Sequence, residues 1–343
     1  MAYLRSHTTL PVPRILGWSD DSSNHIGAEY IIKEHVAGVR LHERWSTMAG
    51  QQHMLCVKAL SMMIKEMAAI AFPSYGRLYF SNAPIKPHLK PELADGFCLR
   101  PHRGATSWNC NTDEARIYGN SNHNRGPWLD LPNYCSGLID TGFSRIPKAN
   151  IQTDKRLPYQ GSIEEHTCPL NTSREVIERL IESPLIQNTA SPTLLHAELH
   201  KRNIYVSDED PTLVTGLIDG QSTSVEPAFI YANETPDFAA HPDHVPLADD
   251  GRETPAGKGE IVEDKKYKDA LLCSQTFDVC MKGFVPKLRA ARALDDMLLK
   301  PFRYCHSSWR DSAAAVRQEL IEVSKSWKEL GLAGSCPYLP TEE

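Results

Sequence analysis

Two acidic residues and an asparagine are spaced as metal-assisted phosphoryl transfer requires. Glu198 is followed five positions later by Asn203, and Asp219 comes sixteen positions after that, at the end of an apolar run. In this chemistry one carboxylate orients the attacking hydroxyl, while an amide oxygen and a second carboxylate provide the hard oxygen ligands that Mg²⁺ prefers. Either piece alone is a weak signal. Together, and in this order, they indicate a site for phosphoryl transfer.

Two histidines flank the first of these carboxylates. His196 and His200, with Glu198 between them, form H-x-E-x-H, a pattern that resembles a zinc site. The metalloprotease pattern, however, is H-E-x-x-H on a helix, whereas this stretch lies in a predicted loop and is followed by no cysteine pair. The sequence therefore disfavours a zinc centre.

Short strands are expected to position these residues. Apolar runs separated by polar turns predict strands at 193–195, 204–206 and 213–218. Asn203 directly precedes the second strand and Asp219 directly follows the third. Both candidate metal ligands are thus predicted to lie at strand ends.

Further elements are predicted on either side of this region. Apolar positions spaced by three and four predict helices at 51–71 and 173–185. Two apolar runs at 12–18 and 28–33, joined by turn-forming residues, predict a hairpin. A third helix is predicted along one apolar stripe, formed by Ala313, Val316, Leu320, Val323, Trp327 and Leu330.

Two long segments lack such periodicity. Residues 73–160 are rich in proline, glycine, asparagine and aromatic residues, and we expect short helices and an aromatic-pinned surface segment there. Residues 235–266 contain four prolines and many aspartates, and predict an exposed loop.

Size and composition restrict the class of protein. The chain has 343 residues, of which 41% are hydrophobic, and a formal net charge of −6. This is enough apolar material for a buried core, and at roughly 150 residues per domain it predicts about two domains or lobes. The longest apolar stretch, 62–72, is too short for a membrane span. With no block of lysine and arginine, we also expect no nucleic-acid partner.

Cysteine usage indicates the redox environment. The nine cysteines are scattered, form no C-x-x-C pair and are odd in number. This pattern predicts reduced thiols in an intracellular setting.

Several motifs together resemble a known family. The chain is similar to the fungal aminoglycoside phosphotransferase-like family, which has a protein-kinase-like fold, in the branch that contains altered inheritance of mitochondria protein 9. The segments that carry this resemblance are His196-x-Glu198-x4-Asn203 with Ile218-Asp219, Pro11-Val12-Pro13, Gly27 to Ile32, Arg125-Gly126-Pro127-Trp128, Asn233 to Pro236, and Pro301 to His306.

The resemblance implies an α+β, two-lobed, protein-kinase-like fold whose N-terminal lobe is truncated and whose C-terminal lobe is mostly helical. Residues 1–36 would be the remnant of the nucleotide-binding lobe and the hinge. Residues 37–343 would be the catalytic-type lobe, with insertions near 73–160 and 235–266.

The same resemblance assigns roles to individual residues. Glu198 would be the general base and His196 would brace its loop, while Asn203 and Asp219 would bind Mg²⁺. The hinge that meets the adenine of ATP would be formed by Glu34, His35 and Val36. The implied reaction is transfer of a phosphoryl group from ATP to the hydroxyl of a small molecule, which the sequence does not name.

Three departures from the family pattern weaken the enzyme interpretation. The family's base is normally Asp, and Glu198 carries its carboxylate about 1.5 Å further out. Because a misplacement of about 1 Å can cost on the order of 100-fold in rate, we expect impaired activity. The glycine-rich loop and phosphate-binding lysine of the family are absent ahead of 12–18, and Gly220 replaces a frequent aromatic residue.

These departures support an alternative from another class. The chain would then be a catalytically inactive pseudokinase that serves as a binding or structural protein, with a protein partner. The resemblance implies a mitochondrial location, and a cytoplasmic one is expected if Met1 is the genuine start.

Overall fold

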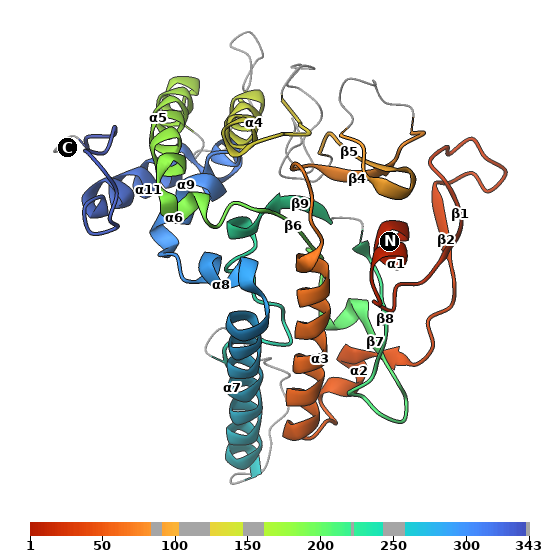
Figure 1. Ribbon diagram of the computed structural model, residues 1–343. Coiled ribbons are helices and arrows are strands. Elements are labelled where there is room, and N and C mark those ends of the chain that lie inside the picture. The colour runs from red at the N-terminus through yellow and green to blue at the C-terminus, as the bar shows by residue number, and fades with distance from the viewer. Residues whose placement is uncertain (84–90, 103–123, 147–160, 221–222, 243–257, 341–343) are drawn as a thin grey trace. The chain divides into compact units, whose positions relative to one another are not determined.

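Short antiparallel strands and longer helices make up the chain in the computed structural model, which describes residues 1–83, 91–102, 124–146, 161–220, 223–242 and 258–340 (Figure 1). The predicted mixture of helices and antiparallel strands is confirmed. No helix in the described ranges is long and apolar enough to cross a membrane. Every cysteine within these ranges is a free thiol.

The chain forms two compact units, each built from three segments. Unit 1 comprises 1–70, 194–223 and 234–289, and unit 2 comprises 71–193, 224–233 and 290–343. The boundary predicted between residues 36 and 37 lies inside unit 1 and stays a prediction.

Unit 1 contains the predicted N-terminal hairpin. Strands β1 (Ile15–Ser19) and β2 (Tyr30–Lys33) pair antiparallel, with Trp18 opposite Ile31. In the connecting turn, the Asn24 amide donates to the Ala28 carbonyl at 2.7 Å and accepts from the Ile26 N–H at 2.8 Å. An asparagine that bonds the neighbouring backbone in this way explains why the polar segment forms a turn.

Unit 1 also contains a three-stranded antiparallel sheet. Its strands are β3 (Val39–Arg40), β7 (Ile204–Val206) and β8 (Val214–Leu217), in the order β3-β7-β8. The strands predicted at 204–206 and 213–218 are confirmed.

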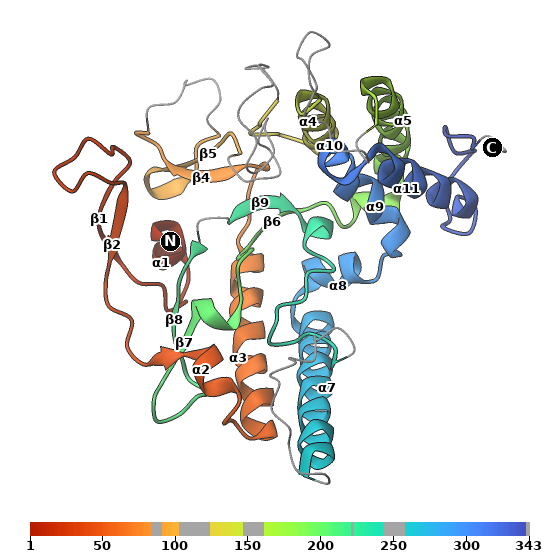
Figure 2. The same ribbon diagram turned by 180° about the vertical axis from the view of Figure 1, so that it is seen from behind.

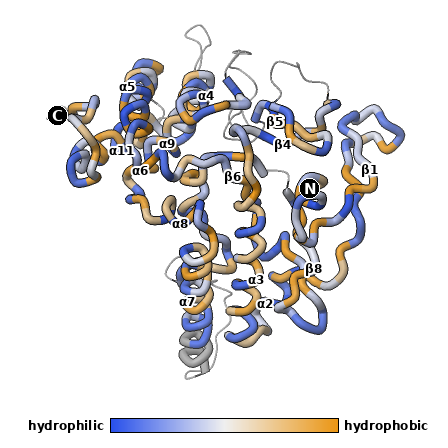
Figure 3. Tube along the Cα trace, viewed as in Figure 1, coloured by the Kyte–Doolittle hydropathy of each residue, from blue (hydrophilic) through white to orange (hydrophobic). Residues whose placement is uncertain are grey.

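Two long helices lie side by side in unit 1 (Figures 1 and 2). The first, α3 (Gly50–Ala69), confirms the helix predicted at 51–71, and Figure 3 shows polar and apolar residues alternating along it. The second, α7 (Lys258–Phe284), begins inside the loop predicted at 235–266. That prediction was wrong for residues 258–266, which form the start of this helix. Residues 243–257 lie outside the described residues. The short helices of unit 1 are α1 (Ala2–His7) and α2 (Leu41–Trp45).

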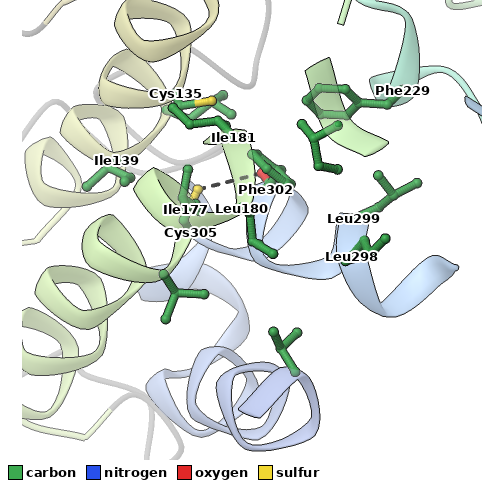
Figure 4. Close-up of a cluster of buried hydrophobic side chains, with 14 of the residues drawn as sticks. Cys135, Ile139, Ile177, Leu180, Ile181, Phe229, Leu298, Leu299, Phe302 and Cys305 are labelled. Atoms are coloured by element: carbon green, nitrogen blue, oxygen red, sulfur yellow. Dashed lines mark hydrogen bonds between the residues drawn. The ribbon is translucent and has the colours of Figure 1, made fainter. Parts of the chain in front are cut away.

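Unit 2 is built around a helical core (Figure 4). The core helices are α4 (Leu131–Ser144), α5 (Ile163–Glu182), α9 (Asp296–Tyr304) and α11 (Ala313–Ser326). All six residues of the predicted C-terminal stripe are buried, which confirms it. The helix predicted at 173–185 begins earlier, because Ser162 and Glu165 form a reciprocal capping box at its start.

The segment 73–160 differs from its prediction where it is described. It contains a hairpin of β4 (Arg77–Phe80) and β5 (Phe97–Arg100) in addition to α4, and not only short helices. Trp128 is buried and packs in the core, as expected of an aromatic residue that pins this segment: its ring meets Tyr134 edge-on at 5.1 Å, and its indole N–H donates to Asn124 at 2.9 Å. The ranges 84–90, 103–123 and 147–160 lie outside the described residues.

Shorter elements complete the chain. They are α6 (Pro184–Gln187), β6 (Pro192–Leu195), β9 (Ser224–Pro227), α8 (Pro286–Arg292), α10 (Ser308–Asp311) and the 3₁₀ turns Ala94–Gly96, Lys201–Asn203 and Ala228–Ile230.

Candidate functional site

The β7–β8 hairpin determines where the two predicted metal ligands lie. Ile204 at the start of β7 is opposite Leu217 at the end of β8. The ladder continues by one further bond, from the Ile218 N–H to the Asn203 carbonyl at 2.9 Å. Asn203 and the residue before Asp219 are therefore joined directly by their backbones.

His196 joins the same two loops through its ring. Its Nε2 lies 2.8 Å from the Ile218 carbonyl, which can only accept, and its Nδ1 lies 3.2 Å from the N–H of Glu198, which can only donate. These partners fix the neutral ring with its proton on Nε2. Burial lowers the pKa of His196, which also favours the neutral form.

Asn203 is buried, and its hydrogen bonds hold the loop that contains Glu198 and His200. Its Nδ2 donates to the Glu198 carbonyl at 2.9 Å, and its backbone N–H donates to the His200 carbonyl at 2.8 Å. Because the amide nitrogen is used inside the loop, the side-chain oxygen Oδ1 is the atom that the residue can offer to a cation.

Asp219 follows β8 in a left-handed backbone conformation, with φ of 64°. Aspartate and asparagine tolerate this region better than other residues that carry a side chain. The preceding residues are held on both sides, since the Leu217 N–H donates to the Pro11 carbonyl at 2.8 Å and Ile218 is bonded as described above. The position of the Asp219 backbone is thus well determined.

Glu198 differs from these residues because its backbone is held but its carboxylate is not. The side chain is 44% exposed, and the contact of its carboxylate within the described chain is with His200, from Oε2 to Nε2 at 3.5 Å. A carboxylate with one long contact keeps several rotamers. Contacts within the described chain therefore leave the position of the Glu198 carboxylate unfixed.

The three predicted hinge residues have different surroundings. The carboxylate of Glu34 accepts from the N–H of Arg14 and from its guanidinium, both at 2.9 Å, and its own N–H donates to the Arg14 carbonyl. The bond from the Arg14 N–H lowers the pKa of Glu34. His35 is exposed, whereas Val36 packs on β8, where a Cβ at Gly216 would meet its Cγ1 at 2.2 Å. Of the three, Val36 is placed beside the strand that leads to Asp219.

The sequence did not predict the role of Asp237, which supports the loop that contains Lys201. The Asp237 carboxylate accepts from the Lys201 N–H at 2.9 Å, and the Lys201 ammonium lies 4.0 Å from it and 5.0 Å from the centre of the Trp45 ring. Asp237 directly follows the Asn233 to Pro236 motif, and this position was the feature of the sequence that could have pointed to it. Without a contact map, nothing in the sequence relates it to Lys201.

The donor set suits magnesium in combination with a phosphate ligand. Oδ1 of Asn203 and the carboxylate of Asp219 are hard oxygen donors, which Mg²⁺ prefers. No group of three or more His, Cys, Asp or Glu side chains is arranged to hold a metal in the part of the chain that the structure describes. Mg²⁺ is usually held by one or two carboxylates together with substrate phosphates and water, and the site fits that pattern.

Comparison with known proteins gives several distant relatives, although no family model matches the chain. A subtelomeric hrmA-associated cluster protein of Aspergillus fumigatus is 26% identical over 275 residues, which cover 70% of this chain and 52% of that protein. The mitochondrial altered inheritance of mitochondria protein 9 of Kluyveromyces lactis is 22% identical over 264 residues, covering 68% and 41%. The chain spans about half the length of the curated relatives it matches, or less.

Two solved structures are similar to the chain. The ADP-bound aminoglycoside phosphotransferase APH(2'')-Ib has 12% identity, covers 96% of this chain and 80% of its own, and gives a TM-score of 0.40. An aminoglycoside phosphotransferase from Alicyclobacillus acidocaldarius has 13% identity, covers 96% and 94%, and gives 0.20. The homologues of this chain thus include the fungal altered inheritance of mitochondria protein 9, the protein whose branch its motifs resemble.

Proposed function

We propose that unit 1 carries a site for a magnesium-bound nucleoside triphosphate, of the type used in phosphoryl transfer to a small-molecule hydroxyl. One observation carries the proposal: the bond from Ile218 to Asn203 and the bridge through His196 bring the two predicted oxygen ligands to neighbouring positions. The motifs predict that Asn203 and Asp219 lie close together. The pairing of β7 with β8 supports this, because it sets Ile204 opposite Leu217.

In this proposal each residue has a separate task. Asn203 and Asp219 would hold Mg²⁺, which when bound offsets the charge that develops between the β- and γ-phosphates. Glu198 would accept the proton of the attacking hydroxyl at its carboxylate. His196 keeps the two loops in register and takes no part in the proton transfer, because its ring nitrogens are both engaged by backbone groups.

The segment before β3 would complete the nucleotide site. Val36 lies against Gly216 of β8, and the Thr215 hydroxyl donates to the Ala37 carbonyl at 2.6 Å. These contacts support the proposal that Glu34, His35 and Val36 form the edge that meets the adenine. The mitochondrial proteins among the relatives support a mitochondrial location for this chain.

A second function, nucleotide binding without transfer, is favoured by one specific observation. The Glu198 carboxylate is exposed and meets only a long contact with His200 in the described chain, so the group that must accept the proton is the least well held in the site. A protein of this kind would act as a binding or structural partner of another protein.

Calorimetric titration of the full chain with ATP, in the presence of Mg²⁺ or of EDTA, tests the site. We expect binding that needs the metal and that weakens at least 10-fold in Asp219→Asn. Asparagine is the appropriate replacement because it tolerates the left-handed backbone that Asp219 adopts. Asp208→Asn is the matched control, since it removes one negative charge from the exposed turn of the same hairpin.

The outcomes distinguish phosphoryl transfer from nucleotide binding alone. Equal affinity for Asp219→Asn and the unchanged chain, or binding that is indifferent to EDTA, would contradict the proposed metal site. Metal-dependent binding without turnover on any hydroxyl acceptor, and without ATP hydrolysis, would support binding alone over transfer.

A further inference from the structure

The β1–β2 hairpin of unit 1 exposes large apolar side chains on both of its faces. Trp18 is paired with Ile31, so the two side chains leave the same face, and they are 60% and 69% exposed. On the other face Ile32 is 48% exposed, and its cross-strand partner Gly17 has no side chain to cover it. Apolar side chains gathered on a surface in this way indicate a site of interaction.

The outer edge of β2 has no strand beside it in the part of the chain that the structure describes, because β1 and β2 form a sheet of two strands (Figure 1). The N–H of Glu34, just after β2, donates towards β1, to the Arg14 carbonyl at 2.9 Å. Backbone groups alternate in direction along a strand, so those of Ile31 and Lys33 point to the free edge. Such an edge is a template for another strand, and a hairpin of two strands is only marginally stable alone.

The residues along this edge are complementary to themselves. Glu29 directly precedes β2 and Lys33 ends it, so the two charges lie at equal distances along the chain from Ile31. If two β2 strands pair antiparallel about Ile31, each Glu29 lies opposite the Lys33 of the other copy. Both residues are exposed, and neither forms an ion pair within the described ranges. Opposite charges in directly paired positions favour strand pairing, and the symmetry provides this pair twice.

We propose that the free edge of β2 binds the same edge of a second copy of this chain. The two hairpins would form one antiparallel sheet of four strands, with a two-fold axis at Ile31. Its backbone N–H and C=O would pair with those of its symmetry mate, and Trp18 and Ile31 of both copies would form one apolar row across the sheet. This interaction surface uses none of the residues assigned to the nucleotide site.

Sedimentation equilibrium of the full chain, without nucleotide, tests the proposal. For an interface as small as one pair of edge strands we expect a dissociation constant on the order of 10 µM. The mean particle mass should then rise from 38.4 kDa towards twice that value as the concentration increases from about 1 to about 200 µM. Because a two-fold axis closes the interface, association should stop at the dimer.

Charge exchange tests the register of the two strands. Lys33→Glu would place carboxylates opposite each other at both ends of the interface, and should weaken association at least about 10-fold. Adding Glu29→Lys to this variant restores opposite charges in exchanged positions, and should return association to nearly its original strength. Lys58→Glu makes the same charge change at an exposed position of α3 in the same unit, and as the control it should leave association unchanged.

Ile31→Pro tests the backbone contact itself. Proline removes the N–H that points to the free edge and leaves the N–H groups that face β1, so the hairpin should remain while the dimer is lost. Ile31→Val keeps the N–H and an apolar side chain and should retain the dimer. Circular dichroism of each variant shows whether the chain is folded.

A particle mass that stays at 38.4 kDa over the whole concentration range would overturn the proposal, and would leave the edge of β2 to a strand of another protein. A dimer that is equally stable in Lys33→Glu and in Ile31→Pro would also overturn it, because association would then use another surface. Asp219→Asn should dimerise like the unchanged chain, so a failure of the nucleotide site and a failure of this surface give different results.

Discussion

The length of one side chain decides how Glu198 can act. Its backbone is held by His196 and Asn203, so a shorter side chain at this position would end closer to the loop without disturbing it. We therefore expect Glu198→Asp to raise the rate of phosphoryl transfer severalfold, because it draws the carboxylate inward by about one bond length of 1.5 Å.

The measurement is a coupled assay of ADP release with a panel of hydroxyl acceptors. Glu209→Asp, an equal shortening of an exposed acid at the far end of the hairpin, is the control and should leave the rate unchanged. A rate for Glu198→Asp that stays at the background level would show that the position of this carboxylate is not what limits turnover.

A single histidine should make unit 2 sensitive to acid. Burial lowers the pKa of His306 from its usual value of 6.5 to about 4. Since the unfolded chain takes up the proton at higher pH than the folded one, stability is complete above about pH 6.5 and is lost as the pH falls towards 4. The shift corresponds to at most roughly 3 kcal/mol in the free energy of unfolding.

Urea denaturation between pH 7 and pH 4 would measure this slope. In His306→Gln the slope over this interval should be shallower, because the replacement cannot be protonated. His241→Gln, in unit 1, is the comparison and should keep the steep slope. An identical slope in all three proteins would assign the acid sensitivity to other groups.

At the scale of elements, the site depends on a close approach between the segment before β3 and the β7–β8 hairpin. A Cβ at Gly38 would lie 2.1 Å from the Val206 carbonyl oxygen, and its φ of 92° disfavours any residue with a side chain. Because the obstacle is backbone, it cannot move aside cheaply. Gly38→Ala should therefore lower the free energy of unfolding by about 2 kcal/mol or more.

Chemical denaturation followed by far-UV circular dichroism would measure this loss. Gly17→Ala is the matched control, since Gly17 lies in β1 of the same unit with open space around its Cβ position and no positive φ. We expect that control to be close to neutral. Equal stability of the two variants would mean that β3 separates from β7 at little cost.

Local patterns were sufficient to predict some of these elements. Strands at 204–206 and 213–218 follow from apolar runs between polar turns, and their short separation makes antiparallel pairing the natural outcome. Once they pair, Asn203 and Asp219 must lie near each other. The candidate loop could thus be predicted from sequence because its partners are close along the chain.

Contacts between distant segments could not be predicted in this way. The buried contact between His102 Nε2 and Glu226 Oε1, at 2.6 Å, joins residues 124 positions apart, and the hydrogen bond from Lys201 to Asp237 joins residues 36 positions apart. The β4–β5 hairpin was missed because each strand has only 4 residues and the two are far apart for a hairpin. Its register, which pairs Arg77 with Arg100, is specified by no single-residue pattern.

At the scale of the whole molecule, the main apolar core and the proposed nucleotide site belong to different units. The large cluster of apolar side chains around α4, α5, α9 and α11 lies entirely in unit 2, whereas the proposed nucleotide site lies in unit 1. Ligand binding stabilises the folded part that holds the ligand. Magnesium ATP should therefore slow hydrogen exchange in 194–220 and leave the exchange of the core helices of unit 2 unchanged.

Hydrogen exchange followed by mass spectrometry would measure this pattern, and Asp219→Asn should remove the protection of 194–220. If magnesium ATP also protects the core helices of unit 2, the two units are energetically coupled. Protection confined to unit 2 would contradict the assignment of the nucleotide site to unit 1.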